Sequence, residues 1–185
     1  MEKIKLQKFN ILPYIQAGDR FGFYWCMQRK HRKLFTRASH WVSKTADGFY
    51  YPTIPLALWL ADSPLAFPVL MVLCIAFSIE RPLYFVLKRS CKRHRPADIL
   101  PGFDSFIVPS DKFSFPSGHT SGAFLMATVL TAFFPMLIPA CFVWASTVAL
   151  SRIFLGVHFP TDTLVGALLG SGIGLFALSF IRSFI

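Results

Sequence analysis

Acidic residues are scarce in this sequence of 185 residues, which has 9 Asp and Glu against 19 Lys and Arg. Charged residues of both signs make up only 15% of the chain, below the roughly 25% of an average soluble domain. This low charge, combined with 54% hydrophobic residues, excludes intrinsic disorder, which requires the opposite composition. It also argues against a soluble nucleic-acid-binding protein, despite a formal net charge of +10.

Cysteine is also scarce, and the four cysteines are spaced neither as metal ligands nor as a disulfide framework. The sequence offers no cluster of carboxylates for a divalent cation. We therefore expect neither a metal ion nor another cofactor, and the cations that serve this protein are expected to be its own side chains.

Charge is absent altogether from residues 120–151 and 163–181. A helix that crosses a bilayer needs about 20 mostly apolar residues, so both stretches are predicted to lie in a membrane. Pro135 and Pro139 indicate a turn that divides the first stretch into two helices. The predicted spans are residues 49–61, 64–87, 118–134, 139–156 and 162–184. We expect an all-α, polytopic integral membrane helix bundle of five to six transmembrane helices.

Residues 1–48 contain ten of the basic residues, mixed with Phe, Tyr and Trp. This composition is typical of helices that lie in the membrane interface, with a basic cytoplasmic tail as the alternative. We therefore divide the chain into an interfacial N-terminal region, residues 1–48, and a transmembrane domain, residues 49–185.

Three polar blocks lie at the ends of the predicted spans, where charged residues indicate function. They are Lys88–Pro96 (KRSCKRHRP), Pro116–His119 (PSGH) and Ser151–Asp162 (SRIFLGVHFPTD). Because the helices alternate in direction, all three blocks are predicted to meet at one membrane face.

The first chemical signal in these blocks is cationic. Lys88, Arg95 and Arg152 are expected to converge on one pocket, as for binding a phosphate. Ser117 and Gly118 open a helix whose free N–H groups and dipole also favour an anion.

The second signal is a pair of histidines. Asp162 follows His158 by four residues and would orient its ring, leaving the other ring nitrogen free as a nucleophile. His119 lies beside the anion site and could protonate a leaving oxygen. This arrangement predicts phosphoryl transfer through a phosphohistidine, followed by hydrolysis.

The motifs Lys88-x6-Arg95-Pro96, Pro116-Ser117-Gly118-His119 and Ser151-Arg152-x5-His158-x3-Asp162 resemble the three signature motifs of the type 2 phosphatidic acid phosphatase (PAP2) superfamily. The resemblance implies His158 as nucleophile, Asp162 as its partner and His119 as general acid. It further implies metal-independent catalysis by residues 49–185, with the phosphoryl oxygens held by Lys88, Arg95, Ser117, Gly118 and Arg152.

The other charged residues receive structural interpretations. Arg89, Lys92 and Arg93 are interpreted as interfacial charges without a motif position. Glu80 and Arg81 are expected to pair with each other or with a neighbouring helix. The series Gly166, Gly170 and Gly174 predicts close helix packing, within one chain or between subunits.

The predicted partners are membrane lipids and an amphiphilic lipid phosphate. The resemblance favours hydrolysis of undecaprenyl pyrophosphate, with phosphatidylglycerol phosphate or phosphatidic acid as alternatives. A non-enzymatic anion or lipid transporter and a haloperoxidase are more remote alternatives. We expect a bacterial inner membrane, and the resemblance implies a site facing the periplasm or exterior. The positive-inside rule points the other way, because Lys and Arg gather on the motif face. The sequence leaves the oligomeric state open.

Overall fold

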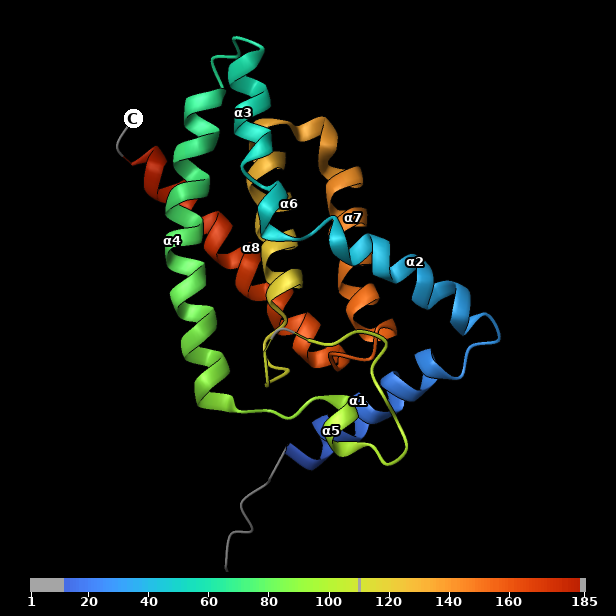
Figure 1. Ribbon diagram of the computed structural model, residues 1–185. Coiled ribbons are helices and arrows are strands. Elements are labelled where there is room, and N and C mark those ends of the chain that lie inside the picture. The colour runs from blue at the N-terminus through green and yellow to red at the C-terminus, as the bar shows by residue number, and fades with distance from the viewer. Residues whose placement is uncertain (1–11, 110, 184–185) are drawn as a thin grey trace, which may run out of the picture.

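The computed structural model describes residues 12–109 and 111–183, and all the regular structure in this part of the chain is helical (Figure 1). The elements, in chain order, are α1 (Leu12–Met27), α2 (Arg32–Lys44), η1 (Gly48–Tyr50), α3 (Thr53–Leu60), α4 (Ala66–Cys91), α5 (Pro96–Ile99), α6 (Gly118–Phe133), η2 (Pro135–Leu137), α7 (Ile138–Phe154) and α8 (Pro160–Arg182).

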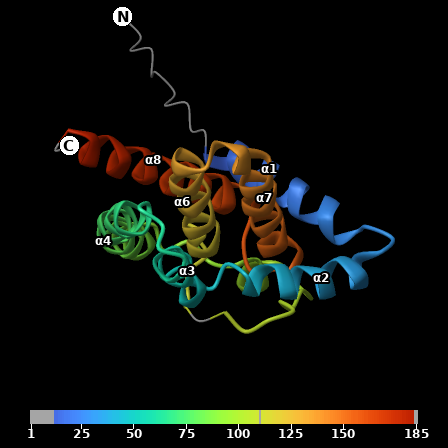
Figure 2. The same ribbon diagram turned by 90° about the horizontal axis from the view of Figure 1, so that it is seen from above.

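The helices α4, α6, α7 and α8 form the bundle (Figures 1 and 2). Helix α6 is central, since it packs against α8, α7 and α4. The largest core cluster joins α4, α6 and α8 through Val69, Val72, Leu125, Met126 and Ile173, all of which are buried. The packing of these side chains against one another holds the three helices together.

Three helical segments of the described residues are long and apolar enough to cross a membrane, whereas the sequence predicted five to six spans. They are residues 66–99, 135–154 and 160–182. The predicted span at residues 49–61 contains only α3, whose eight residues rise about 12 Å. Helix α6 has 16 residues and rises about 24 Å, which is less than the roughly 30 Å of a hydrocarbon core. Prolines and turns shorten these two helices, and the count of five to six spans stays a prediction.

The three polar blocks meet at one end of the bundle, as the helix directions predicted. The C-terminal ends of α4 and α7 and the N-terminal ends of α6 and α8 lie at the lower end in Figure 1. Residues 92–109, which include α5, and residues 111–117 cross this end of the bundle (Figure 1).

The N-terminal region of the described chain forms two helices, α1 and α2, on the side of the bundle that contains α7 (Figure 2). Several large aromatic side chains on them are exposed, including Phe21, Trp25 and Trp41. The Arg29 guanidinium lies 3.4 Å from the centroid of the Trp25 ring. Exposed aromatics beside cations are consistent with the interfacial position expected of residues 1–48, of which residues 1–11 lie outside the described chain.

The glycine series of α8 packs inside the monomer, against α6. A Cβ atom at Gly170 would lie 2.0 Å from the Ser121 carbonyl oxygen, and one at Gly166 would lie 2.6 Å from the Ser117 carbonyl oxygen. Only glycine allows this approach, which holds the start of α6 against the start of α8.

Candidate active site

A cavity of about 540 Å³ opens at the polar end of the bundle. Six of the eight predicted site residues line it: Lys88, Arg95, Gly118, His119, Arg152 and His158. Much of the remaining lining is apolar and comes from the η1–α3 segment and α4, with Tyr51, Pro52, Pro55, Leu73 and Phe77. The cavity thus combines groups that suit a phosphate with groups that suit an apolar chain.

Two cations of the first block share a carboxylate that the sequence did not single out. Lys88 Nζ lies 2.7 Å from Asp111 Oδ2, and Arg95 donates from its guanidinium to Asp111 Oδ1. Tyr84 also donates to Asp111, at 2.9 Å. Partial burial opposes ionisation of Asp111, but the hydrogen bond and charge of Lys88 outweigh it and lower the pKa of this carboxyl. Asp111 is therefore an anion held where two cations converge.

Arg95 reaches the cavity because the chain leaves the helix before it. Helix α4 ends at Cys91, and Lys92 adopts a left-handed conformation with φ 46°. Arg95 is extended, with φ −77° and ψ 162°, as its position before Pro96 predicts. It donates to the Val157 carbonyl at 2.7 Å, which ties the first block to the residue preceding His158.

The second block forms the N-terminus of α6, which begins at Gly118 after Ser117. Gly118 lines the cavity, and a Cβ atom there would lie 3.0 Å from the Tyr84 ring. Ser117 is fully buried and does not line the cavity: its hydroxyl lies 2.9 Å from the Thr120 hydroxyl, and its N–H donates to the Asp162 carbonyl at 3.0 Å. Ser117 therefore joins the second block to the third.

His158 lies in the short connection between α7 and α8 and is 2% exposed. Its Nδ1 is 3.8 Å from Asp162 Oδ2, an ion-pair distance too long for a hydrogen bond, and no other described group bonds to this nitrogen. Burial lowers the pKa of His158 to about 3, so the ring is neutral at pH 7. With Nδ1 turned toward Asp162, Nε2 is the nitrogen available to attack a phosphorus atom.

The α2 helix and the loop after it also reach the site, which the sequence did not indicate. Arg152 is 5% exposed and donates to the Ser43 hydroxyl at 2.6 Å. His119 Nε2 lies 3.0 Å from Asp47 Oδ1, and Asp47 also lines the cavity. The N-terminal region therefore contributes to the candidate site as well as to the surface.

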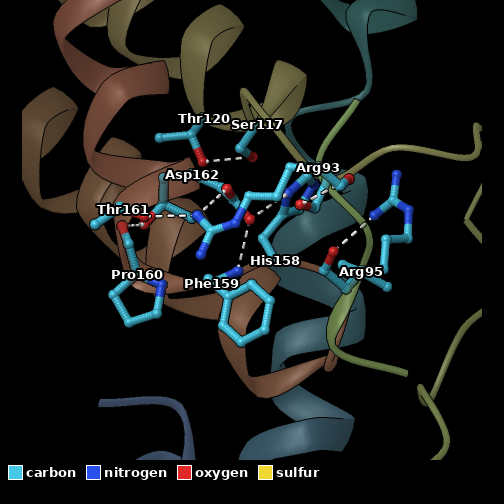
Figure 3. A network of polar contacts seen from close by, with 12 residues as sticks. Arg93, Arg95, Ser117, Thr120, His158, Phe159, Pro160, Thr161 and Asp162 are labelled. Carbon is cyan, nitrogen blue, oxygen red and sulfur yellow. Dashed lines mark hydrogen bonds and ion pairs between the residues drawn. The ribbon is translucent and has the colours of Figure 1, made fainter. Parts of the chain in front are cut away.

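The interpretation of Arg93 as an interfacial charge is wrong. Its guanidinium is directed inward and donates to Asp162 Oδ1 at 2.8 Å and to Asp19 Oδ2 at 2.5 Å (Figure 3). The two buried carboxylates account for this orientation. Asp19 also accepts from the N–H of Thr161, which lies 142 residues further along the chain. In contrast, Glu80 and Arg81 form the predicted pair, and Glu80 also accepts from the Ser121 hydroxyl at 2.6 Å.

The fold and this site define an all-α membrane protein with a cationic cavity at the end of its helix bundle. Residues 63–184 match the PAP2 superfamily. Since this match covers more than half of the chain, the protein belongs to the PAP2 superfamily. In the described part of the chain, no group of three or more His, Cys, Asp or Glu side chains could hold a metal.

Curated relatives from several organisms resemble the chain. Phosphatidylglycerophosphatase B of Bacillus subtilis is 35% identical over 111 residues, which cover 54% of this chain and 52% of the relative. Decaprenylphosphoryl-5-phosphoribose phosphatase of Mycobacterium tuberculosis is 34% identical over 96 residues, 52% of each protein. The chain thus spans about half the length of these relatives.

Solved structures extend the likeness to most of the chain. The crystal structure of LpxE from Aquifex aeolicus has a TM-score of 0.72 and 30% identity, covering 83% of this chain and 90% of that one. The transmembrane PAP2-type phosphatidylglycerolphosphate phosphatase of Bacillus subtilis has a TM-score of 0.71 and covers 93% of this chain and 88% of that one. At 24% identity, this structural likeness shows a shared fold and no more.

Proposed function

We propose that this protein is a metal-independent phosphatase that hydrolyses the phosphate or pyrophosphate group of a membrane lipid. The observation that carries the proposal is the cavity itself, whose lining combines the three motif cations and both motif histidines with apolar side chains of α3 and α4. A phosphate that carries a long apolar chain matches both kinds of lining.

The proposed reaction has two steps. His158 Nε2 attacks the phosphorus atom, the bond to the leaving oxygen breaks, and His119 donates a proton to that oxygen. Water then attacks the phosphohistidine, His119 takes its proton, and inorganic phosphate leaves with His158 restored. Lys88, Arg95 and Arg152, with the N–H of Gly118, are proposed to hold the phosphoryl oxygens. Ser117, whose N–H is bonded to the Asp162 carbonyl, is proposed to fix the start of α6 beside them.

Two structural features support this assignment of roles. His158 is neutral and its Nδ1 faces Asp162, so the positive charge that forms on the ring during attack lies beside a carboxylate. Asp111 already bonds to two of the proposed phosphate ligands, which shows that these cations accept an anion between them.

The substrate that we propose first is undecaprenyl pyrophosphate, which becomes undecaprenyl phosphate and inorganic phosphate. A phosphatidylglycerol phosphate or phosphatidic acid phosphatase is the second candidate, and the relative named phosphatidylglycerophosphatase B favours it. We further propose that the site faces the exterior or periplasm of a bacterial inner membrane, since motif chemistry accounts for part of the charge on that face.

Phosphate release tests this function. The purified protein in detergent, with a chelator present, is offered undecaprenyl pyrophosphate, phosphatidylglycerol phosphate and phosphatidic acid in parallel. We expect turnover of at least one lipid and its loss in His158→Ala, with the ratio of kcat/KM values ranking the substrates. Full activity in His158→Ala would remove the nucleophile assignment, and binding of all three lipids without release would favour a transporter.

A further inference from the structure

Arg93 is partly buried and joins two buried carboxylates, Asp19 and Asp162. Figure 3 shows its guanidinium bonded to Asp162, next to His158. The left-handed turn at Lys92 directs the chain away from the axis of α4, so that Arg93 lies over the Phe159 ring at 4.6 Å. Its NH1 donates to Asp162 Oδ1 and, at 2.7 Å, to the Thr161 hydroxyl. Arg93 thereby holds the oxygen of Asp162 that does not face His158.

The other oxygen of Asp162 is also held in place. Asp162 Oδ2 accepts from the Phe159 N–H at 2.8 Å and faces His158 Nδ1. Asp162 is 0% exposed. A buried carboxylate with fixed partners on both oxygens has one orientation, which determines where the His158 ring meets it.

Asp19 of α1 holds Arg93 from the opposite side. Asp19 is 2% exposed, and its Oδ2 lies 2.5 Å from both Arg93 NH2 and the Thr161 hydroxyl. Its Oδ1 accepts from the Thr161 N–H at 2.9 Å. Helix α1 is thus bonded to the first turn of α8, next to Asp162.

The charges of this network have a consequence for the reaction. Asp19 and Asp162 carry two negative charges and Arg93 one positive charge, so with His158 neutral the group has one net negative charge. Arg93 alone would cancel the charge of Asp162 and weaken its attraction for a cationic ring. Asp19 offsets Arg93, so that one negative charge remains for the moment when His158 becomes cationic.

We propose that Arg93 and Asp19 are a positioning pair that fixes Asp162 beside His158 and keeps one net negative charge there for the cationic phosphohistidine. The pair touches no substrate atom and acts only through Asp162. Helix α1 is therefore part of the catalytic apparatus as well as of the surface. This inference rests on the proposed phosphohistidine mechanism.

The test compares single and double variants in the phosphate-release assay. We expect Arg93→Met and Asp19→Asn each to lower kcat by about 10- to 100-fold while KM changes by less than about threefold, because neither residue binds substrate. Arg89→Met, at an exposed position in the last turn of α4, four residues before Arg93, is the matched control and should keep wild-type kinetics.

The double variant separates this role from simple anchoring of α1. In Arg93→Met the two buried carboxylates have lost their shared cation, so adding Asp19→Asn should raise kcat several-fold above that of Arg93→Met. Two independent anchors would instead give multiplied losses, and that result, or wild-type kcat in Asp19→Asn, would overturn the proposal. Should Arg93→Met fail to fold in detergent, Arg93→Lys and Asp19→Asn are measured instead, and the same loss of kcat at nearly unchanged KM is expected of each. An inactive wild-type protein would instead overturn the proposed function.

Discussion

Asp111 Oδ2 lies 2.7 Å from Lys88 Nζ, so a carboxylate of the protein itself is paired with a cation that is proposed to bind the substrate. The same carboxylate bonds to Arg95 through its other oxygen. An incoming phosphate meets these cations only by displacing Asp111 or by sharing them with it. The charge of Asp111 should therefore oppose phosphate binding.

Asp111→Asn should tighten the binding of inorganic phosphate, because the amide does not compete for Lys88 and Arg95. Asp111 is 35% exposed, so we expect a gain of about two- to fivefold, or roughly 0.4–1 kcal/mol, in the inhibition constant of inorganic phosphate. Asp104→Asn, at an exposed position of the same connecting segment, should leave that constant unchanged. Weaker phosphate inhibition in Asp111→Asn would show that Asp111 organises the site rather than competes with the ligand.

His158 should make stability depend on pH in the acid range. Its pKa is about 3 in the folded protein and about 6.5 when unfolded, so the unfolded state binds a proton that the folded state refuses. The stability of the wild type should thus fall as the pH drops below about 6.5, with a slope of up to about 1.4 kcal/mol per pH unit. Thermal midpoints in detergent between pH 4 and 8 measure this slope.

His158→Gln supplies the comparison for this effect, because it removes the titrating ring and keeps a side chain of similar polarity. The difference in thermal midpoint between wild type and variant should be constant above about pH 7. Below that pH, the midpoint of the wild type should fall more steeply than that of His158→Gln. Parallel midpoint curves would mean that His158 titrates alike in both states.

Gly170 and Gly172 provide a matched pair for the packing of α8 on α6. Gly170→Ala places a Cβ atom 2.0 Å from the Ser121 carbonyl oxygen and should destabilise the protein by about 1–3 kcal/mol. Nothing lies within 4 Å of a Cβ atom at Gly172, so Gly172→Ala should be neutral or stabilising by up to about 1 kcal/mol. Denaturation in mixed detergent measures both, and equal midpoints would contradict this helix contact.

Membrane orientation can be read from two exposed positions at opposite ends of the bundle. Val108 is 95% exposed on the segment that crosses the polar end, and Met136 is 93% exposed in η2 between α6 and α7. Ser110, an obvious label position from sequence, lies outside the described residues. In a background with the four native cysteines replaced, a site facing outward predicts that an impermeant maleimide labels Val108→Cys in intact cells.

Met136→Cys is the internal control and should react only after the cells are opened. The reverse pattern would place the site in the cytoplasm, in agreement with the positive-inside rule. Labelling of both positions in intact cells would mean that the membrane was already permeable, and the comparison is then repeated at lower reagent concentration.

The sequence was most informative where function depends on residues close together in the chain. His158 and Asp162, or Ser117 and Gly118, occur at short, fixed spacings at helix ends, and the cavity contains most of the residues so predicted. Asp19, Asp47 and Asp111 are single carboxylates without a motif, so only the fold brings them to the site. Arg93 was misread for the same reason, since its partner Asp19 is 74 residues away.

The length of each helix could not be predicted from the sequence, for a different physical reason. Hydropathy measures how apolar a stretch is, whereas crossing a bilayer requires an unbroken rise of about 30 Å. Pro52 and the turn at Asp62 confine α3 to eight residues, and Phe134 ends α6 after 16. Apolar composition therefore located the bundle correctly but did not determine the length of each helix.

The bond from the Ser117 N–H to the Asp162 carbonyl has an evolutionary consequence. An amide and a carbonyl exist at these positions whichever side chains the residues carry, so the alignment of the second and third motifs is inherited with the backbone. Substitution of the Ser117 side chain can therefore leave this join in place, provided that Gly166 and Gly170 keep the two helices in close approach. A bond between main-chain atoms can thus persist while the side chains around it diverge. The structure with a TM-score of 0.72 and only 30% identity is in accord with such divergence within a shared fold.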